Sequence, residues 1–413
     1  MLDIKFIREN REQVARSAAD KGYAVNITTL LEVDERRRTL MTQVDELRAK
    51  RNQIAQQMKG GKPAPELVEQ GKNVKTDLAK LESELNTTTN KFDQIMATVP
   101  NVISPDTPIG DESNSATVRE WGERTSGAVD HLDFALKRDW VDFERGAKVA
   151  GAKFYYLKND LALLENAVLQ FALQKISEHG FNLLTVPHLV NARTMTGAGF
   201  APRTSEQSDE YAIQDEDLQL IATAEIPLTG YHADEIIDET KLPLLYAGYS
   251  PCYRREAGAA GKHTRGLFRV HQFNKLEMYA FCAPEQSNEI HEKILAVEEE
   301  ICQELGLPYR VVNIASGDMG APAWQKYDIE YWSPVDGSYR ELASCSNCTD
   351  YQARNLNIRV RRADGSIETL HTLNGTAVAL ARTLVAIIEN CQQNDGLRVP
   401  KPLRQFLNNR EEI

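Results

Sequence analysis

The sequence predicts a protein of mixed helices and strands in two domains, a helical hairpin followed by a larger domain that contains the strands. Three observations carry this prediction. The chain has 413 residues, more than one domain usually holds. Apolar residues recur at helical spacings of three and four between about residues 27 and 98. Residues 268–279 instead alternate with a period of two, as a strand does.

The composition is that of a soluble globular chain without a general affinity for nucleic acid. Apolar residues make up 42% and charged residues 26%, and the net charge is −12. A negative chain gives no overall electrostatic attraction to RNA or DNA. Any such contact must therefore depend on local charge.

No segment predicts export or a membrane span. The N-terminal stretch MLDIKFIRENREQ is acidic in part and lacks the apolar core of a secretory signal. The most apolar helical run, TAVALARTLVAII, is interrupted by Arg382 and is too short to cross a bilayer. We therefore expect a cytoplasmic protein. Cys345 and Cys348 form a lone CxxC, which predicts packed, reduced thiols, because zinc would need a second ligand pair.

Residues 27–98 predict two long helices that pack against each other. Pro and Gly are nearly absent apart from GGKPAP at 60–65, which marks a tight turn. An antiparallel coiled coil of about 45 Å, at ~1.5 Å per residue, would bury the apolar residues on both sides of it. The predicted seam comprises Leu30, Val33, Leu40, Val44, Leu47, Ile54 and Met58, with Arg37 and Arg51 between them, and Leu67, Val74, Leu78, Leu81, Leu85, Phe92, Ile95 and Val99.

This arm differs in charge from the rest of the chain. It carries 12 Lys and Arg against 11 Asp and Glu, so the net negative charge lies elsewhere. Its first helix contains two basic clusters, which form a candidate phosphate-contacting stripe. The clusters are Arg36, Arg37 and Arg38, followed by Arg48, Lys50 and Arg51. A solvated coiled-coil face is the alternative interpretation.

A domain boundary follows the arm. The stretch VPNVISPDTPIGDESNSATVREWG, at 99–122, contains three prolines and no periodicity, which predicts a linker. We therefore expect an N-terminal domain of residues 1–100 and a second domain of residues 101–413.

Two segments of the second domain predict an antiparallel strand pair with a polar face. In LLYAGYSPCYRREAG, at 244–258, Arg254 and Glu256 lie two apart and would share a face. A Gly-rich loop at 258–267 would lead into FRVHQFNKLEMY. One face of that second strand would present Arg269, His271, Phe273, Lys275 and Glu277.

The residue types on this face suit an extended ligand. Guanidinium groups bind phosphate or carboxylate, a phenyl ring stacks on a purine, and a carboxylate binds an ammonium. Phe273 and Glu277 would lie ~13 Å apart at about 3.3 Å per residue. These features together predict a site for ATP beside an amino acid. Cross-strand ion pairs on a solvated strand are the alternative.

Several motifs then resemble the class II aminoacyl-tRNA synthetases, in their seryl-tRNA synthetase form. SPCYRREAGAAGKHTRGLFRVHQFNKLEMY is similar to motif 2, and GFNLLTVPHLV resembles the motif 1 segment of the dimer interface. TAEIPLT, YRELASCSNCTDYQARN and LNGTAVALARTLVAIIEN follow in the family's order, and the last is similar to motif 3. The resemblance implies an α+β fold, an antiparallel sheet flanked by helices, in a homodimer whose coiled-coil arm binds tRNA.

The resemblance also implies the nucleotide site. Arg254 would hold the α-phosphate and the amino-acid carboxylate, Phe273 would stack on the adenine near Glu256, and Arg382 would cover its other face. Glu341 and Ser344 would bind Mg²⁺. The complete set of implied ATP contacts is Arg254, Arg255, Glu256, Arg269, Val270, Phe273, Glu341, Leu342, Ala343, Ser344 and Arg382.

The implied serine pocket consists of Thr223, Ala224, Glu225, Glu277 and Thr376. By the same resemblance, Arg254, Glu277, Glu341 and Arg382 would carry the catalysis. The serine carboxylate would attack the α-phosphorus of ATP, and the resulting seryl-adenylate would pass its serine to tRNA(Ser). Whether tRNA(Sec) is also charged stays open.

Two other functions remain open from the sequence. A related ligase that loads an amino acid onto a carrier protein would lack the long arm, so residues 27–98 argue against it. A tRNA-binding paralogue without activity would have no evident use for Arg254, Glu256, Glu277, Glu341 and Arg382.

Overall fold

The structure, a computed structural model, describes residues 1–59, 64–200, 210–256, 265–393 and 396–413. The chain forms two compact units. One spans Leu2–Pro100, and the other comprises Met1 and Asn101–Ile413. The turn at 60–63 and most of the predicted loop at 258–267 lie outside the described residues.

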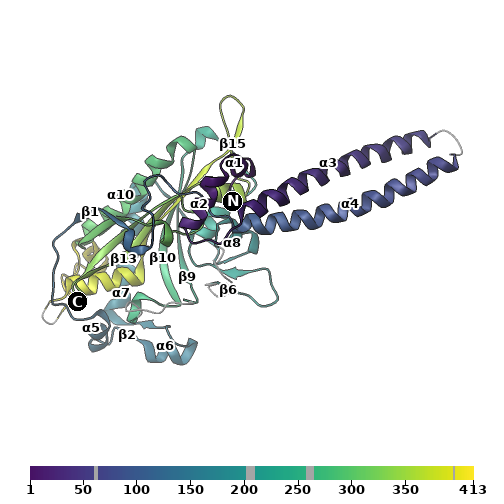
Figure 1. The fold of residues 1–413 in the computed structure, drawn as a ribbon. Helices are drawn as coiled ribbons and strands as arrows, with labels where there is room; N and C mark the ends of the chain where they lie inside the picture. Colours follow the sequence, from purple (N-terminus) through teal and green to yellow (C-terminus); the bar gives the residue numbers. More distant parts are fainter. Residues whose placement is uncertain (60–63, 201–209, 257–264, 394–395) are drawn as a thin grey trace. The chain divides into compact units, whose positions relative to one another are not determined.

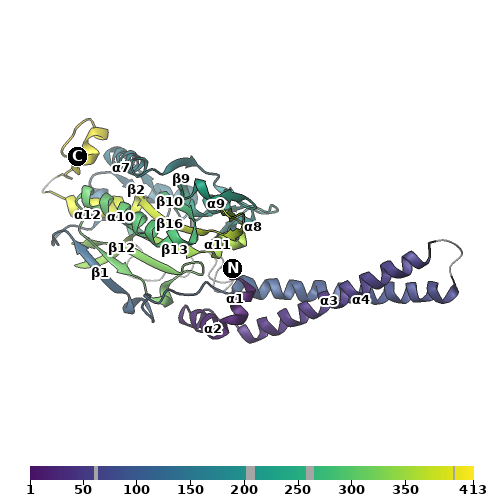
Figure 2. The same cartoon turned by 90° about the horizontal axis from the view of Figure 1, so that it is seen from above.

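The smaller unit is helical throughout its described part. α1 (Ile4–Glu9) and α2 (Arg11–Asp20) precede the long helices α3 (Ile27–Gln57) and α4 (Pro65–Thr98), which run antiparallel side by side (Figures 1 and 2). Asn26 caps α3 by accepting a hydrogen bond from the Thr29 N–H, and Pro65 occupies the first turn of α4. The seam buries Leu30, Val33, Leu40, Val44, Ile54, Val74, Leu78, Phe92 and Met96. The predicted helical arm is confirmed.

The basic clusters of the arm divide into paired and unpaired residues. Arg36 and Arg48 reach across to Glu84 and Glu82 of α4, the second pair at 2.8 Å. Arg37 pairs with Asp34 at 3.1 Å and lies 4.1 Å above the Phe92 ring, which places it in the seam. The remaining three basic residues are exposed and pair with no carboxylate in the described part of the chain; they are Arg38, Lys50 and Arg51.

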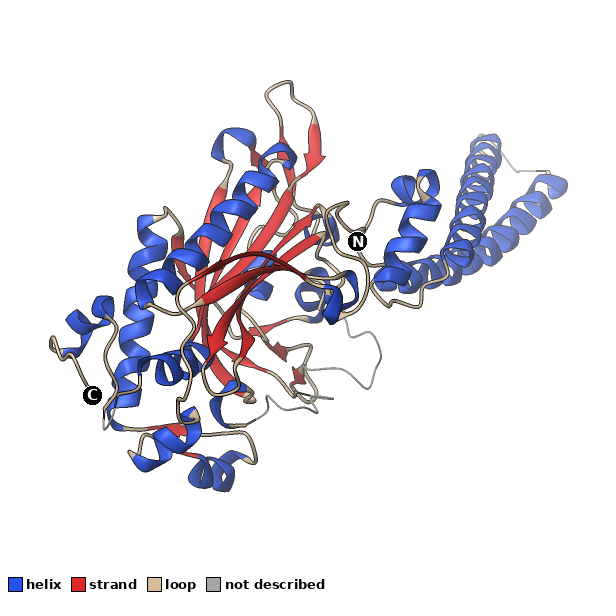
Figure 3. Ribbon diagram, turned by 60° about the vertical axis from the view of Figure 1, so that its left-hand side comes forward, coloured by secondary structure: helices blue, strands red, loops and turns tan. Residues whose placement is uncertain are grey.

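The larger unit is built on an eight-stranded sheet in the order β1-β11-β12-β13-β16-β10-β9-β4. Its strands are β1 (Ala116–Trp121), β4 (Asn182–Thr185), β9 (Leu244–Tyr253), β10 (Gln272–Cys282), β11 (Tyr309–Asn313), β12 (Gln325–Ser333), β13 (Ser338–Thr349) and β16 (His371–Ala379). Neighbours pair antiparallel except β4, which runs parallel to β9. The predicted sheet flanked by helices is therefore confirmed, although it is mixed (Figure 3).

Side-chain alternation along β10 separates the two faces of the sheet. Leu276 and Met278 point into the core formed with α7 (Asn159–Glu178), α10 (Ser287–Leu305) and α12 (Leu380–Cys391). Tyr279 and Phe281 point the other way, into a second core beside α8 (Ala192–Gly197), α9 (Glu225–Gly230) and α11 (Tyr351–Asn355). Residues of β10 that precede Tyr279 on this second face are available for a site.

Short elements complete the larger unit. The helices are α5 (His131–Lys137) and α6 (Phe143–Ala150). The strands are β2 (Val141–Asp142), β3 (Tyr156–Leu157), β5 (Leu189–Val190), β6 (Tyr211–Ala212), β7 (Gln219–Leu220), β8 (Ile236–Asp238), β14 (Arg359–Arg361) and β15 (Ile367–Thr369). Among the described helices, none is long and apolar enough to span a bilayer. The six cysteines are buried free thiols.

Three predicted boundaries are wrong. Residues 116–121 of the predicted linker form the edge strand β1, and each of its six residues is exposed. A strand without a buried face leaves no apolar alternation in the sequence. The strand predicted from residue 268 begins instead at Gln272, because Gly266–Phe268 form a 3₁₀ turn. Likewise β9 ends at Tyr253, so Arg254 and Glu256 lie beyond the strand.

Candidate active site

A cleft opens beside β10, β13, β16 and the start of α12, and its empty space of about 540 Å³ includes the part that is open to solvent. Most of the residues predicted to contact ATP line it, namely Arg254, Glu256, Arg269, Val270, Phe273, Glu341, Leu342, Ala343, Ser344 and Arg382. Arg255 is exposed and does not line the cleft.

The polar face of β10 is arranged as its alternation predicts. Phe273 and Lys275 both line the cleft, and Lys275 Nζ lies 2.6 Å from Glu277 Oε2. Glu277 is 2% exposed and lies next to the cleft residue Thr376, whose Oγ1 is 3.2 Å from Glu277 Oε2. The phenyl ring and the carboxylate therefore share one side of the sheet.

Aromatic rings and guanidinium groups meet at the mouth of the cleft. The Arg254 guanidinium lies 5.2 Å from the centre of the Phe273 ring, and its Nε donates to the Ala222 carbonyl oxygen at 3.4 Å. Arg269 Nη1 donates to Glu256 Oε2 at 2.8 Å. Cross-strand ion pairs on a solvated strand were the alternative interpretation of these residues. The pair of Arg269 and Glu256 instead lies in the cleft.

A β-bulge places Glu341 and Ser344 on the same face. Ala343 pairs with Ile329 and Glu341 pairs with Glu330, so Leu342 is an additional residue between them. Without the bulge, residues three apart in a strand would face opposite sides. Because of it, Glu341 and Ser344 lie on the same face of the strand, and both line the cleft.

The Glu341 carboxylate is ionised and paired. Arg382 Nη1 lies 2.9 Å from its Oε2. Desolvation opposes ionisation, but the positive charges of Arg382 and Lys326 outweigh it and hold the pKa of Glu341 below its ordinary value. The Arg382 guanidinium also lies 4.9 Å from the centre of the Phe268 ring, so it is held from two sides.

The predicted serine residues lie deeper than the nucleotide residues. Thr223, Ala224, Glu225, Glu277 and Thr376 are all buried. The Glu225 N–H donates to Thr223 Oγ1 at 3.2 Å, at the start of α9. Thr376 alone of these five lines the described cleft.

Glu225 is held by amides, and no lysine or arginine in the described part of the chain forms a salt bridge with it. Gln352 Nε2 and Asn374 Nδ2 donate to its Oε1 at 2.8 and 3.0 Å. Desolvation, followed by repulsion from Glu277, raises the pKa of Glu225 to about 7. The two buried carboxylates, Glu225 and Glu277, therefore lie near one lysine, Lys275. The ammonium group of a ligand would supply a second positive charge.

Sequence reasoning assigned no role to several residues of this site. Lys275 was visible in the alternation of β10 but received no function, although it lines the cleft and pairs with Glu277. Phe268 and Lys326 gave no signal, because their contacts with Arg382 and Glu341 join segments far apart in the chain. Gln352 also gave no signal, because its hydrogen bond to Glu225 joins two distant segments of the chain.

The sheet and its cleft define the core of a class II aminoacyl-tRNA synthetase. The sequence model of the tRNA synthetase class II core domain (G, H, P, S and T) matches residues 209–391, and that of the Seryl-tRNA synthetase N-terminal domain matches residues 1–103. Serine–tRNA ligases of Dictyoglomus turgidum and Dictyoglomus thermophilum are 46% and 47% identical to the chain, with 98% of both chains covered in each case. The chain belongs to the seryl-tRNA synthetase family.

Solved structures agree with this assignment. The seryl-tRNA synthetase from Pyrococcus horikoshii complexed with ATP has a TM-score of 0.91 and 40% identity, covering 100% of this chain and 99% of that one. The cytoplasmic serine–tRNA ligase from Naegleria fowleri in complex with AMP has a TM-score of 0.86 and 30% identity, covering 100% and 98%. The resemblance inferred from the sequence motifs is confirmed.

Proposed function

We propose that this protein activates L-serine with ATP and transfers it from seryl-adenylate to tRNA(Ser). One observation carries the proposal beyond family membership. A cleft lined by arginines and a phenyl ring also contains Lys275 and Thr376, which both contact the buried carboxylate of Glu277. A purine with its phosphates fits the arginines and the ring, and the ammonium of an amino acid fits the carboxylate.

ATP would replace contacts that the cleft residues now make with one another. Arg254 lies over the Phe273 ring, so an adenine that stacks there requires this guanidinium to turn toward the α-phosphate and the serine carboxylate. Arg382 would cover the other face of the adenine and reach the γ-phosphate. Arg269 and the Val270 backbone would hold the nucleotide beside Glu256. Arg255 is exposed and does not line the cleft, so we assign it no contact with ATP.

Glu341 and Ser344 fit a Mg²⁺ ion. Both residues line the same cleft, and the Glu341 side chain is 42% exposed with the pKa of its carboxyl group lowered, which matches the oxygen ligands that Mg²⁺ prefers. Once bound, such an ion would neutralise charge on the phosphates.

Serine would bind between the two buried carboxylates. Its ammonium would form an ion pair with Glu225 and would contact Glu277, with Thr223 and Ala224 in the wall. The Thr376 hydroxyl, which donates to Glu277 at 3.2 Å, would accept a hydrogen bond from the serine hydroxyl. This arrangement selects a small amino acid with a hydroxyl group.

The reaction then follows from position and charge. The ionised serine carboxylate attacks the α-phosphorus in line, and pyrophosphate leaves, so no general base is needed. Arg254 and Arg382 stabilise the charge that develops on the phosphates. The terminal ribose hydroxyl of the tRNA next attacks the carbonyl carbon of the adenylate and releases AMP.

The helical arm and the motif 1 segment would supply the remaining partners. Exposed cations of α3 would contact the phosphates of tRNA(Ser), and tRNA(Sec) is a second candidate for the same surface. Leu183 and Leu189, of the motif 1 segment, are 54% and 38% exposed, and a second copy of the chain in a homodimer would cover them. We place this enzyme in the cytoplasm.

Exchange of labelled pyrophosphate into ATP tests the proposed chemistry directly. We expect exchange that depends on serine, because adenylate formation is reversible. If no amino acid supports exchange, the enzyme is excluded and the tRNA-binding paralogue remains.

Alanine provides the specificity test in the same assay. A pocket built to bind a hydroxyl leaves buried polar groups unpaired with alanine, so alanine-dependent exchange should be lower by ~10⁴ in kcat/KM. Comparable activation of alanine and serine would contradict the roles of Glu277 and Thr376.

A further inference from the structure

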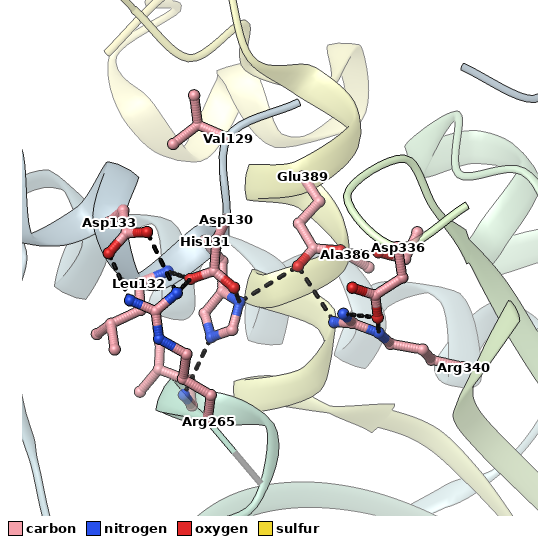
Figure 4. A network of polar contacts seen from close by, with 12 residues as sticks. Val129, Asp130, His131, Leu132, Asp133, Arg265, Asp336, Arg340, Ala386 and Glu389 are labelled. Carbon is pink, nitrogen blue, oxygen red and sulfur yellow. Dashed lines mark hydrogen bonds and ion pairs between the residues drawn. The ribbon is translucent and has the colours of Figure 1, made fainter. Parts of the chain in front are cut away.

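A buried polar network lies outside the roles described so far. It joins the start of α5, the second half of α12, the beginning of β13 and the turn Gly266–Phe268 (Figure 4). At its centre His131 is 2% exposed and the Glu389 side chain is fully buried. His131 Nδ1 lies 3.2 Å from Glu389 Oε1.

The contacts of His131 fix its tautomer. The backbone N–H of Leu267 points to Nε2 at 3.3 Å, and because an N–H can only donate, Nε2 must accept. The ring proton is therefore on Nδ1, which donates to Glu389. His131 therefore bridges α12 and the turn.

The acceptor capacity of Glu389 is filled. Its Oε1 accepts from His131 and from Arg340 Nη1 at 3.2 Å, and its Oε2 accepts from Ser333 at 2.7 Å and Tyr331 at 3.2 Å. A carboxylate offers about four acceptor positions. Asp130, His131 and Glu389 are close enough to hold a metal, but their atoms are committed to these bonds and to Arg265. The network is therefore structural rather than a metal centre.

The turn Gly266–Phe268 is held by α5 on both sides of its glycine. Arg265 pairs with Asp130 at 3.0 Å and with Asp133 at 2.5 Å. Gly266 has φ of +60°, and a Cβ atom there would lie 2.3 Å from His131 Nε2. Only glycine allows the histidine ring to approach this closely.

The same turn supplies part of the nucleotide cleft. Leu267, Phe268, Arg269 and Val270 line it, and the Phe268 ring lies under the Arg382 guanidinium. Arg382 and Glu389 are seven residues apart on α12, so they lie on the same side of that helix, about 10 Å apart along its axis. The helix α12 thus carries both Arg382, which lines the nucleotide cleft, and Glu389, which holds His131 beside the turn.

We propose that His131 is a positioning residue for ATP. Its bond to Leu267 holds the turn Gly266–Phe268, so that Phe268 and Arg269 are in place before the nucleotide arrives, and its bond to Glu389 orients the ring for this contact. Pre-organisation of this kind strengthens binding, because the ligand does not have to order the turn itself. The inference depends on the proposed function only in naming ATP as the nucleotide.

Two amide substitutions separate the two bonds of the ring. The carboxamide oxygen of His131→Gln can reach the position of Nε2 and accept from Leu267, whereas the amide of His131→Asn can only replace Nδ1 as a donor to Glu389. We expect His131→Asn to weaken the Kd for ATP about five- to tenfold, the effect of one lost hydrogen bond. His131→Gln should stay within about twofold of the unaltered protein, because it keeps the bond to Leu267 that holds the turn.

The measurement is ATP binding by calorimetry, followed by the KM for ATP and for serine in pyrophosphate exchange. The control for each variant is His179→Gln. His179 is a half-buried histidine that pairs with Glu300 and does not line the cleft. The KM for serine should not change, and Gly266→Ala should weaken ATP binding as His131→Asn does.

Several outcomes would overturn the proposal. Unchanged ATP binding in His131→Asn would show that the Leu267 bond does not position the cleft. Equal losses in His131→Gln and His131→Asn, or equal rises in KM for both substrates, would indicate general destabilisation. ATP binding without serine-dependent exchange in the unaltered protein would contradict the proposed function while leaving the role of His131 intact.

Discussion

The arm and the catalytic cleft both pair cations with carboxylates, but the surroundings of the pairs differ. On the arm, the side chains of Arg48 and Glu82 are 50% and 41% exposed. In the cleft, those of Lys275 and Glu277 are 8% and 2% exposed. Exposed pairs contribute little and exchange partners readily, whereas a buried charge that loses its partner is costly. The same residue types can therefore serve an adaptable RNA surface in one unit and a fixed site in the other.

Removal of the arm should have the largest effect, because it should separate the charging of tRNA from the formation of the adenylate. In a variant with Leu30–Val99 replaced by a short linker, we expect aminoacylation to fall by more than ~10³, the usual gap between specific and non-specific nucleic-acid binding. Pyrophosphate exchange should remain nearly intact, since the larger unit has its own core. Equal losses of both activities would show that the arm is needed for the fold of the cleft.

Removal of a single charge from the cleft, that of Arg382, should have the next largest effect. Arg382→Ala removes the partner of Glu341 and a group that would stabilise the transferring phosphates, so exchange should fall by ~10² or more. Binding of tRNA should be unchanged. Arg145→Ala, in an exposed i,i+3 pair on α6, is the matched control. A loss of less than about threefold in Arg382→Ala would contradict the proposed phosphate contact.

The buried carboxylate of Glu225 also predicts a pH dependence of serine binding. The pKa of Glu225 is raised to about 7, and only its ionised form attracts the serine ammonium. The KM for serine should therefore fall about tenfold as pH rises from about 6 to 8, with the ionised fraction. Glu225→Gln should bind serine weakly and without this dependence. A dependence that persists in Glu225→Gln would assign it to another group.

Substitutions on the arm should have the smallest effects. Replacing Arg38, Lys50 or Arg51 singly by Ala should weaken tRNA binding a few-fold and reduce the salt slope by about one per lost phosphate contact. Arg36→Ala and Arg48→Ala, whose side chains pair within the arm, should change it less. No change in the salt slope for any of the five would favour the solvated coiled-coil interpretation of this face.

Patterns repeated along the chain were predictable from the sequence. The heptads of the arm and the alternation of β10 report which residues share a face, and the structure agrees with both. The seam departs from the prediction at Ile95, which is only half-buried while Met96 is 1% exposed, and at Arg51, which is exposed. Adjacent apolar residues leave the rotation of a helix ambiguous by one position.

Contacts between distant segments were not predictable. The bond from His131 to Glu389 spans 258 residues, and that from Leu267 to His131 spans 136. The sequence around His131 has no period or spacing that names its partners. The family resemblance supplied most residues of the cleft, but Lys275, Phe268 and Gln352 required the structure.

A crystal structure with serine and a non-reactive ATP analogue tests the shared cleft most directly. We expect the adenine between Phe273 and Arg382, and the serine ammonium at Glu225 and Glu277. A purine bound away from the Phe273 ring, or an amino acid that leaves both carboxylates untouched, would contradict the account.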